Sequence, residues 1–358
     1  MKVQLILCSY NGAHYLMAQL DSILKQTETR FRLLISDDCS TDGTAELAAG
    51  YVERFPERVE LWRRTEASGG AARHFLSVLK AYGEKCCAGD ADMGADGSGA
   101  SGAAAPDGEE TEPAALRGAA DYIMFADQDD DWHPDKIERT LQTMQHAEAQ
   151  YGRSTPLLVH CDMRVTDAAG AELASSYVRY QGMSPERNRL NQLLVQNNVT
   201  GGALMMNRAL AELLWRHPLP ECAVMHDHWI ALVAAAFGKI IFLDAALYDY
   251  RQHGENVLGA AKGSRVREIL DRLGLFRKDG RTRAEMNLRS QAAYAALFSQ
   301  AAELFRQYRK EMPAAERRTL REFLSLRHKS RAGKIYGILR CGFTFNRFHR
   351  TVGECLFL

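Results

Sequence analysis

Four aspartates lie within five residues of the segment ADQDDDWHP: Asp127, Asp129, Asp130 and Asp131. The segment directly follows DYIMF, an apolar run with the composition of a buried β-strand. Carboxylates at the end of such a strand can share a divalent cation, because Mg²⁺ and Mn²⁺ take carboxylate, water and phosphate oxygens. The same residues also suit a solvated turn that only starts a helix, since Asp is favoured near helix N-termini. The cluster alone leaves both interpretations open.

Two earlier apolar runs also end in polar residues. Residues 3–8 lead into SYNG, and residues 31–36 lead into DDCSTDG. Open parallel sheets bind ligands at the carboxyl ends of their strands, so three polar strand ends indicate a nucleotide-shaped cleft. Neither G-x-G-x-x-G nor G-x-x-x-x-G-K-S/T follows the first run, which leaves dinucleotide and P-loop binding without support.

The elements that would position these residues alternate between strand and helix periodicity. The patterns predict strands at residues 3–8, 31–36, 59–62, 122–126, 157–161, 240–243 and 247–250, and helices at 15–24, 44–55, 71–82, 135–147 and 228–237. Residues 203–206 are an apolar run that follows a polar loop. Pro134 marks one helix start, because proline is favoured at the first helical position. The alternation predicts an α/β fold with a parallel sheet covered on both faces.

Charge is balanced overall, with 45 Lys plus Arg and 45 Asp plus Glu, but it is unevenly distributed. The stretch at residues 84–131 is acidic, and residues 89–113 within it contain a single large apolar side chain, Met93. Such a composition buries too little apolar surface to order itself. We therefore expect residues 84–120 to be a disordered surface insertion, with an acidic interaction segment as the alternative.

Residues 263–358 have a helical, amphipathic and basic character, and residues 305–358 hold thirteen Lys and Arg against four Glu. Such helices suit peripheral contact with an anionic inner membrane, while packing on the protein's own domain and a dimer contact remain alternatives. No recognisable nucleic-acid-binding module accompanies the charge, so we expect no nucleic-acid partner.

Eight scattered cysteines, without C-x-x-C or zinc-type spacing, indicate free thiols in a reducing compartment. No segment reaches the roughly 18 apolar residues that a membrane-spanning helix needs. We expect a cytoplasmic protein that is at most peripheral to a membrane.

Five motifs follow one another along the chain: CSYNGAHYL, DDCSTDGT, ADQDDDWHPDKIE, TGGALMMNR and HDHWIALVAAAFGKIIFLDAALYDYRQHGENVLG. In these motifs the chain resembles the inverting family 2 glycosyltransferases, and most nearly bacterial rhamnosyltransferase-like enzymes of surface polysaccharide synthesis. The resemblance implies a GT-A fold in residues 1–262, with a mostly parallel mixed sheet and a helical C-terminal extension. It also implies a nucleotide-sugar donor, with L-rhamnose as the candidate sugar, a glycan or lipid-linked glycan acceptor, and Mg²⁺ or Mn²⁺.

The resemblance further assigns roles to single residues. Asp227 corresponds to the catalytic base, Asp129 to the direct metal ligand, and Asp127 to a second contact with the metal or the ribose. The other implied positions are Cys8, Tyr10, Asp38 and Arg73 for the nucleotide, His253 for the metal or the phosphates, and Thr200, Gly201, Gly202, His226 and Arg251 for the donor sugar and the acceptor.

Local sequence gives plainer interpretations of some of these residues. Asp227 also suits a helix N-cap, and His253 an ordinary loop position. Asp131 is expected to serve the helix that Pro134 opens, and Asp130 is left undecided.

The chain also departs from the family pattern. Cys8 stands where Thr is common, and Ser68 and His74 replace two asparagines. A non-catalytic nucleotide-sugar or glycan-binding protein on the same fold is therefore the alternative function. A nucleotidyltransferase is a weaker third candidate, because no Gly/Lys/Arg-rich triphosphate loop occurs near the N-terminus.

Overall fold

A computed structural model describes residues 2–92, 120–253, 283–347 and 351. The strands are β1 Val3–Ser9, β2 Phe31–Asp37, β3 Val59–Arg63, β4 Tyr122–Ala126, β5 Asp131–Trp132, β6 Leu157–Thr166, β7 Glu172–Ala174, β8 Leu204–Asn207 and β9 Lys239–Arg251. The α-helices are α1 Ala13–Leu24, α2 Thr44–Arg54, α3 Ala71–Asp92, α4 Lys136–Tyr151, α5 Tyr177–Gln181, α6 Leu190–Leu193, α7 Arg208–Trp215, α8 His226–Phe237, α10 Arg283–Tyr308, α11 Ala314–Ser325 and α12 Arg331–Cys341.

One mixed sheet organises the fold, with the strand order β3-β2-β1-β4-β8-β6-β9-β5 and β7 paired to β6. The first strands form a parallel unit, in which β1 pairs with both β2 and β4 and β2 pairs with β3. Beyond β4 the pairings are antiparallel except for β6 with β9. The predicted α/β fold is confirmed, although the parallel pairings are confined mainly to the N-terminal half. The two strands predicted at 240–243 and 247–250 are one strand, β9.

Successive side chains of a strand point to opposite faces, and both faces of this sheet are covered. Leu5 and Leu7 of β1 pack with α1, α2 and α4 on one face. Ile6 and Cys8 pack with α3, α7 and α8 on the other face. Every residue of β1 is buried, which explains why its sequence reads as a continuous apolar run.

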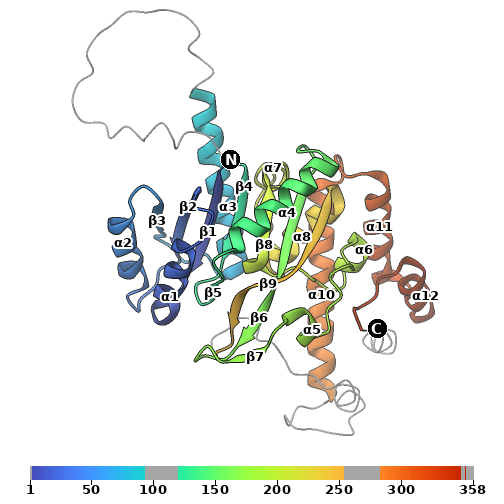
Figure 1. Cartoon of the computed structure of the whole chain (residues 1–358). Helices are drawn as coiled ribbons and strands as arrows, with labels where there is room; N and C mark the ends of the chain where they lie inside the picture. The colour runs from blue at the N-terminus through green and yellow to red at the C-terminus, as the bar shows by residue number, and fades with distance from the viewer. Residues whose placement is uncertain (1, 93–119, 254–282, 348–350, 352–358) are drawn as a thin grey trace, which may run out of the picture.

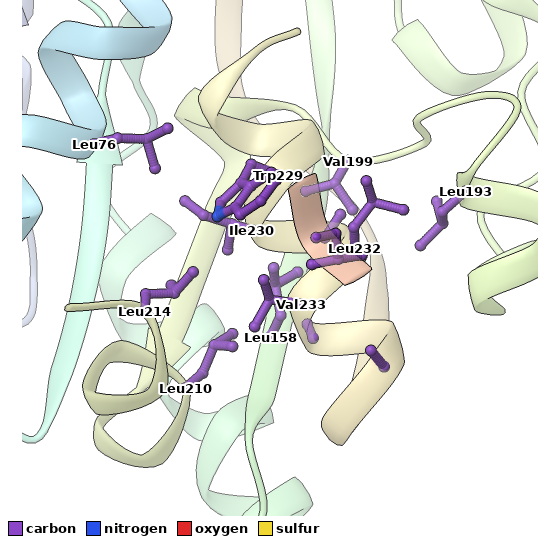
Figure 2. Close-up of a cluster of buried hydrophobic side chains, with 14 of the residues drawn as sticks. Leu76, Leu158, Leu193, Val199, Leu210, Leu214, Trp229, Ile230, Leu232 and Val233 are labelled. Atoms are coloured by element: carbon purple, nitrogen blue, oxygen red, sulfur yellow. The ribbon is translucent and has the colours of Figure 1, made fainter. Parts of the chain in front are cut away.

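Helix α8 lies at the centre of the second cluster. Trp229, Ile230, Leu232 and Val233 meet side chains from the sheet and from α3, α6 and α7 (Figure 2). Trp229 is 1% exposed, so it is a packing residue of this core. Asp227 lies in the first turn of the same helix. The buried side chains of α8 therefore fix the position of Asp227.

The C-terminal helices gather on the side of the molecule remote from α1 and α2 (Figure 1). Phe323 of α11 stacks on Phe298 of α10 with ring centroids 4.7 Å apart, and it meets Phe343, after α12, edge to face at 5.2 Å. All three belong to the cluster that contains α8. Within residues 283–347 the predicted helical character is confirmed, and these helices share their core with the sheet domain.

Helix α3 differs from its prediction. The expected helix stops at residue 82, whereas α3 continues to Asp92 and so includes the first residues of the expected insertion. The remainder of that insertion, residues 93–119, lies outside the described residues. The part of the tail at residues 263–282 does so as well.

The segment after β4 also differs. Asp131 does not serve a helix, because it forms β5 and pairs with Asp249 of β9. Helix α4 begins only at Lys136, and its N-cap residue is Asp135. Long-range pairing to β9 takes precedence here over the local preference of Asp for a helix start.

None of the helices in the described part of the chain is both long enough and apolar enough to cross a membrane. The seven cysteines of that part are free thiols, as the spacing predicted.

The shared core generates a prediction. Phe323→Ala should destabilise the whole fold by about 3–5 kcal/mol, because it empties the space between two aromatic rings of the common core. Urea unfolding followed by circular dichroism should show one transition at a lower midpoint. Tyr336→Ala is the matched control, because this α12 side chain is 64% exposed and should change little. A variant that loses only part of its signal in a separate early step would contradict the shared core.

Candidate active site

A cavity of about 690 Å³ opens where the carboxyl ends of β1, β2 and β4 meet the first turn of α8. Most of the site residues implied by the sequence line it, namely Cys8, Tyr10, Asp38, Asp127, Asp129, Thr200, Gly201, His226, Asp227 and His253. These positions span more than 240 residues of the sequence, and the sheet brings them to one edge. This is the edge at which α/β sheets bind ligands.

Gln128 joins two of the strand ends. Its side chain accepts from the Tyr10 backbone N–H at 2.8 Å and donates to the Tyr10 carbonyl at 3.1 Å. A Cβ on Gly12 would lie 2.2 Å from its Oε1, so this contact requires a glycine at position 12. The loop after β1 is thereby held against the loop after β4.

Asp38 directly follows β2, and its carboxylate is held by hydrogen bonds and an ion pair. Its carboxylate accepts from the Ser68 backbone N–H at 2.7 Å and from the Ser68 hydroxyl at 2.6 Å, and it pairs with Arg64 at 3.2 Å. Ser68 is one of the departures from the family pattern. It therefore orients Asp38, the aspartate that the resemblance assigns to the nucleotide. Nearby, burial and the charges of Asp127 and Asp38 raise the pKa of the Cys8 thiol, which stays protonated.

The aspartates after β4 have separate environments. Asp129 accepts from His253 Nε2 at 2.7 Å at the cavity wall. Burial and the charges of Asp129 and Asp227 raise the pKa of Asp127 to about 7. Asp130 is 1% exposed, and burial together with its neighbours raises its pKa. No described group makes a well-aligned hydrogen bond to its carboxylate, although the Arg251 backbone N–H lies near it.

Lys136 lies fully buried beneath this cluster. Its ammonium donates to the Gly202 carbonyl at 2.6 Å and lies 3.6 Å from the ring centroid of Trp132 and 3.8 Å from that of Tyr248. Burial lowers its pKa to about 8, and the charges of Asp130 and Asp127 oppose that shift. A positive charge is thereby placed directly below the carboxylates.

Asp227 stands in the first turn of α8, one residue beyond the helix start, so it is not the N-cap. Its carboxylate accepts from Asn197 Nδ2 at 3.1 Å and from the Gly201 backbone N–H at 3.1 Å. Burial raises its pKa to about 7 despite these bonds and a backbone N–H of the helix. A carboxylate poised near neutral pH suits proton abstraction.

His226 lies beside this carboxylate but has a different character. It stacks on Phe75 with ring centroids 4.1 Å apart and is 3% exposed. Neither ring nitrogen has a hydrogen-bond partner among the described residues. Burial lowers its pKa to about 3, so the ring is neutral and offers one donor and one acceptor.

Three implied residues do not line the cavity. Gly202 lies behind it and reaches Asp127 through its backbone N–H. Arg251 donates from Nε to the Asp129 carbonyl at 3.2 Å, which places it next to the cavity wall. Arg73 is exposed on α3, where His74 and Phe75 line the cavity instead, so its assignment to the nucleotide is not supported by this arrangement.

A family comparison bears on this site. Residues 4–92 match the family described as "Glycosyl transferase family 2". The N-terminal part of the chain is thus similar to glycosyl transferase family 2. The matched region contains Cys8, Tyr10 and Asp38, whereas the aspartates after β4 and Asp227 lie beyond it.

Two similar glycosyltransferases align over more of the chain. An uncharacterized glycosyltransferase of Nostoc sp. is 23% identical over 77% of this chain and 72% of its own length. The dTDP-rhamnosyl transferase RfbG of Shigella flexneri is 26% identical over 38% of this chain and 36% of its own length. The chain thus spans about a third of the second relative.

A solved structure supports the fold. The crystal structure of Staphylococcus aureus TarS residues 1–349 in complex with UDP aligns with a TM-score of 0.50 over 93% of this chain and 73% of that chain. Identity is 17%, so this likeness concerns the fold alone. The GT-A-type architecture expected from the sequence is therefore confirmed.

Sequence reasoning missed three residues of this site: Gln128, Lys136 and Asn197. The helical period offered a signal for Lys136, because it shares a face with Thr140 and Met144, which are buried. The other two act across long sequence separations, 118 and 30 residues, and no local pattern indicates such contacts.

The close packing of Gly201 against His226 generates a prediction. A Cβ on Gly201 would lie 2.3 Å from His226 Nε2, so Gly201→Ala should displace the loop that donates to Asp227. We expect a loss of stability of about 1–3 kcal/mol in urea unfolding, as in overpacked interiors. Gly50→Ala in α2 is the control, because its Cβ meets nothing within 4 Å and should stabilise the helix by about 1 kcal/mol. Equal responses of the two variants would contradict the tight fit.

Proposed function

We propose that this protein is an inverting glycosyltransferase of surface polysaccharide synthesis. It moves a sugar from a nucleoside-diphosphate donor to a hydroxyl of a glycan or lipid-linked glycan. The observation that carries the proposal is a buried carboxylate, Asp227, with a pKa of about 7, in one cavity with the strand-end aspartates. The match of residues 4–92 to glycosyl transferase family 2 supports the reaction class.

The donor would lie along the ends of β1, β2 and β4. Cys8, Tyr10 and Asp38 would contact the nucleotide base, since they line the cavity at the ends of β1 and β2. Thr200, Gly201 and His226 would contact the donor sugar and the acceptor, because they flank Asp227. Arg251 and Gly202 would support the diphosphate region through Asp129 and Asp127.

Asp127 and Asp129 fit a hard divalent cation, Mg²⁺ or Mn²⁺, because both carboxylates line the cavity and the charge of Asp129 raises the pKa of Asp127. The described residues contain no group of three or more ligating side chains, so diphosphate and water oxygens would complete the coordination. His253 would join as a ligand or orient Asp129, to which it bonds. When bound, the cation neutralises charge on the leaving diphosphate.

Asp227 would act as the base. It takes the proton of the acceptor hydroxyl as that oxygen forms a bond to the anomeric carbon of the sugar. The bond from that carbon to the diphosphate oxygen breaks, and the nucleoside diphosphate leaves with the electron pair. A single base on the face opposite the leaving group gives inversion, by analogy with inverting hydrolysis. Asn197 and Gly201 orient the carboxylate for this step.

L-rhamnose is the proposed sugar, because the chain is similar to the dTDP-rhamnosyl transferase of Shigella flexneri. Purified protein incubated with dTDP-, UDP- and GDP-sugars should bind one class preferentially in a thermal-shift screen. Stabilisation by dTDP-rhamnose above the other donors is the expected outcome. Preference for another donor would remove rhamnose from the proposal.

A non-catalytic sugar- or nucleotide-binding protein is the second candidate. It is favoured by one observation, since both oxygens of Asp38 already bond to Ser68. Donor binding without nucleoside diphosphate release, across donors and glycan acceptors, would support it over the enzyme.

Peripheral contact with the cytoplasmic face of a membrane is proposed for α12. This helix exposes Tyr336 and Leu339, at 64% and 58%, beside the basic residues Arg331 and Arg340. Aromatic and aliphatic side chains flanked by cations suit an anionic lipid surface. Its opposite face buries Ile338 in the core, so only the outer face is available to lipid.

Vesicle sedimentation tests this contact. The protein should bind vesicles that contain phosphatidylglycerol and should leave vesicles of phosphatidylcholine alone, because the attraction is largely electrostatic. Tyr336→Ser with Leu339→Ser should weaken binding by about tenfold or more, since two apolar side chains are lost. Tyr151→Ser, at another exposed tyrosine, is the control. If the double variant binds the vesicles as well as the unmodified protein does, the proposed membrane contact is wrong.

Asp129→Ala tests the donor and cation site. The affinity for a nucleoside diphosphate is measured by calorimetry with and without Mn²⁺. In the variant, the gain in affinity that Mn²⁺ gives should be lost, which is a weakening of at least about tenfold or 1.4 kcal/mol. Asp135→Ala is the control, because this nearby carboxylate pairs with Arg139 on α4. Metal-dependent affinity that survives in Asp129→Ala would exclude this residue as a ligand.

Asp227→Asn tests the base. The pKa of Asp227 is raised to about 7, so the ionised form is lost as pH falls below 7 and the transfer rate should fall with it. The variant should lose roughly 10²–10⁴-fold in kcat together with this acid limb, while donor affinity stays unchanged. Asp244→Asn, at an exposed carboxylate of β9, is the control. A variant with normal turnover and an intact acid limb would assign the base elsewhere.

A further inference from the structure

The loop at residues 196–199 carries Asn197, which donates to Asp227. The rest of Asn197 is used to shape its own loop, because Nδ2 also donates to the Val199 carbonyl at 2.8 Å and Oδ1 accepts from the Val199 N–H at 3.0 Å. The orientation of Asp227 therefore depends on where this short loop stands. Gln196 and Asn197 also line the cavity.

A segment far along the chain, residues 341–347, contacts both neighbours of Asn197. The Asn346 backbone N–H donates to Gln196 Oε1 at 2.9 Å. The Asn346 and Asn198 amides bond reciprocally, at 2.5 and 3.3 Å, and Asn198 is 4% exposed. One asparagine thus fixes the loop from both sides of Asn197.

The same segment is held to the catalytic domain along its length. Arg187 donates to the carbonyl and hydroxyl of Thr344, both at 2.6 Å. Asn191 donates to the Cys341 carbonyl at 2.8 Å. Arg347 donates to the carbonyl of Gln181, another cavity residue, at 2.8 Å. Phe343 is fully buried among the C-terminal helices, which anchors the segment from behind.

We infer that residues 341–347 are part of the transfer machinery, with Asn346 as a positioning residue that holds Asp227 in place through the loop at residues 196–199. The basic tail would thus take part in the transfer reaction as well as in the proposed membrane contact. This inference rests on the proposed function of Asp227 as the base.

Asn346 touches neither the acidic cluster nor the strand ends that would hold the nucleotide. Its loss should therefore change transfer and acceptor binding while leaving donor binding alone. A merely structural role would instead lower donor affinity and transfer together, because both would follow the folded fraction. The two roles separate in one set of measurements.

Asn346→Ala in the full chain is the test. We expect kcat to fall roughly ten- to a hundredfold, as for small displacements of reacting groups, with an unchanged donor Kd. Asn197→Ala should have a similar effect, and the double variant should be no worse than the poorer single variant, because both changes release the same carboxylate. Lys329→Ala is the control, since Lys329 pairs with Glu322 in the same helical region and should keep wild-type turnover.

Hydrogen exchange gives a readout that does not need turnover. In Asn346→Ala, peptides that cover residues 190–200 should exchange faster while those from β1 and β4 keep their protection. Unchanged loop protection, or additive losses in the double variant, would overturn the inference. If the unmodified protein transfers no sugar but the loop still loosens, the proposed function fails while the structural coupling stands.

Discussion

The arrangement of this protein depends on how one sheet edge tolerates its negative charge. Asp127, Asp129 and Asp130 follow β4, and Asp227 enters the same cavity from α8. Burial and mutual repulsion raise the pKa values of Asp127 and Asp130. Lys136, sealed between two aromatic rings, places one opposing charge below them. Clustered buried carboxylates of this kind are electrostatically unfavourable, and a cation bound with a diphosphate would offset that repulsion.

The backbone around this charge is packed tightly because the side chains leave little room. Gly12 faces Gln128, Gly201 faces His226, and both approaches are closer than a Cβ would allow. Gly202 lies between the carboxylates and Lys136, because its backbone N–H donates to Asp127 and its carbonyl accepts from the Lys136 ammonium. Close approach of neighbouring atoms and backbone hydrogen bonds therefore explain the two glycines of the TGG motif.

Much of this site could be predicted from the sequence, because polar residues after apolar runs mark the carboxyl edge of a parallel sheet. The length and partners of some elements could not be predicted. Asp131 reads as a helix-start residue, yet it pairs with Asp249 across 118 positions. Arg73 matched a motif letter, but the phase of α3 turns it outward and brings His74 inward. Local patterns give the type of an element, whereas its phase and pairing depend on residues far away in the chain.

The bond between Asn198 and Asn346 spans 148 residues. A ribosome that adds about 5–20 residues per second would make the second partner roughly 7–30 s after the first. Throughout that interval the nascent chain contains β1, β2 and β4, and α8 is added within its first part, but the segment that braces the loop beside Asp227 is still missing. Synthesis itself would then impose an order on the site, in which the sheet edge is complete before the loop that steadies Asp227.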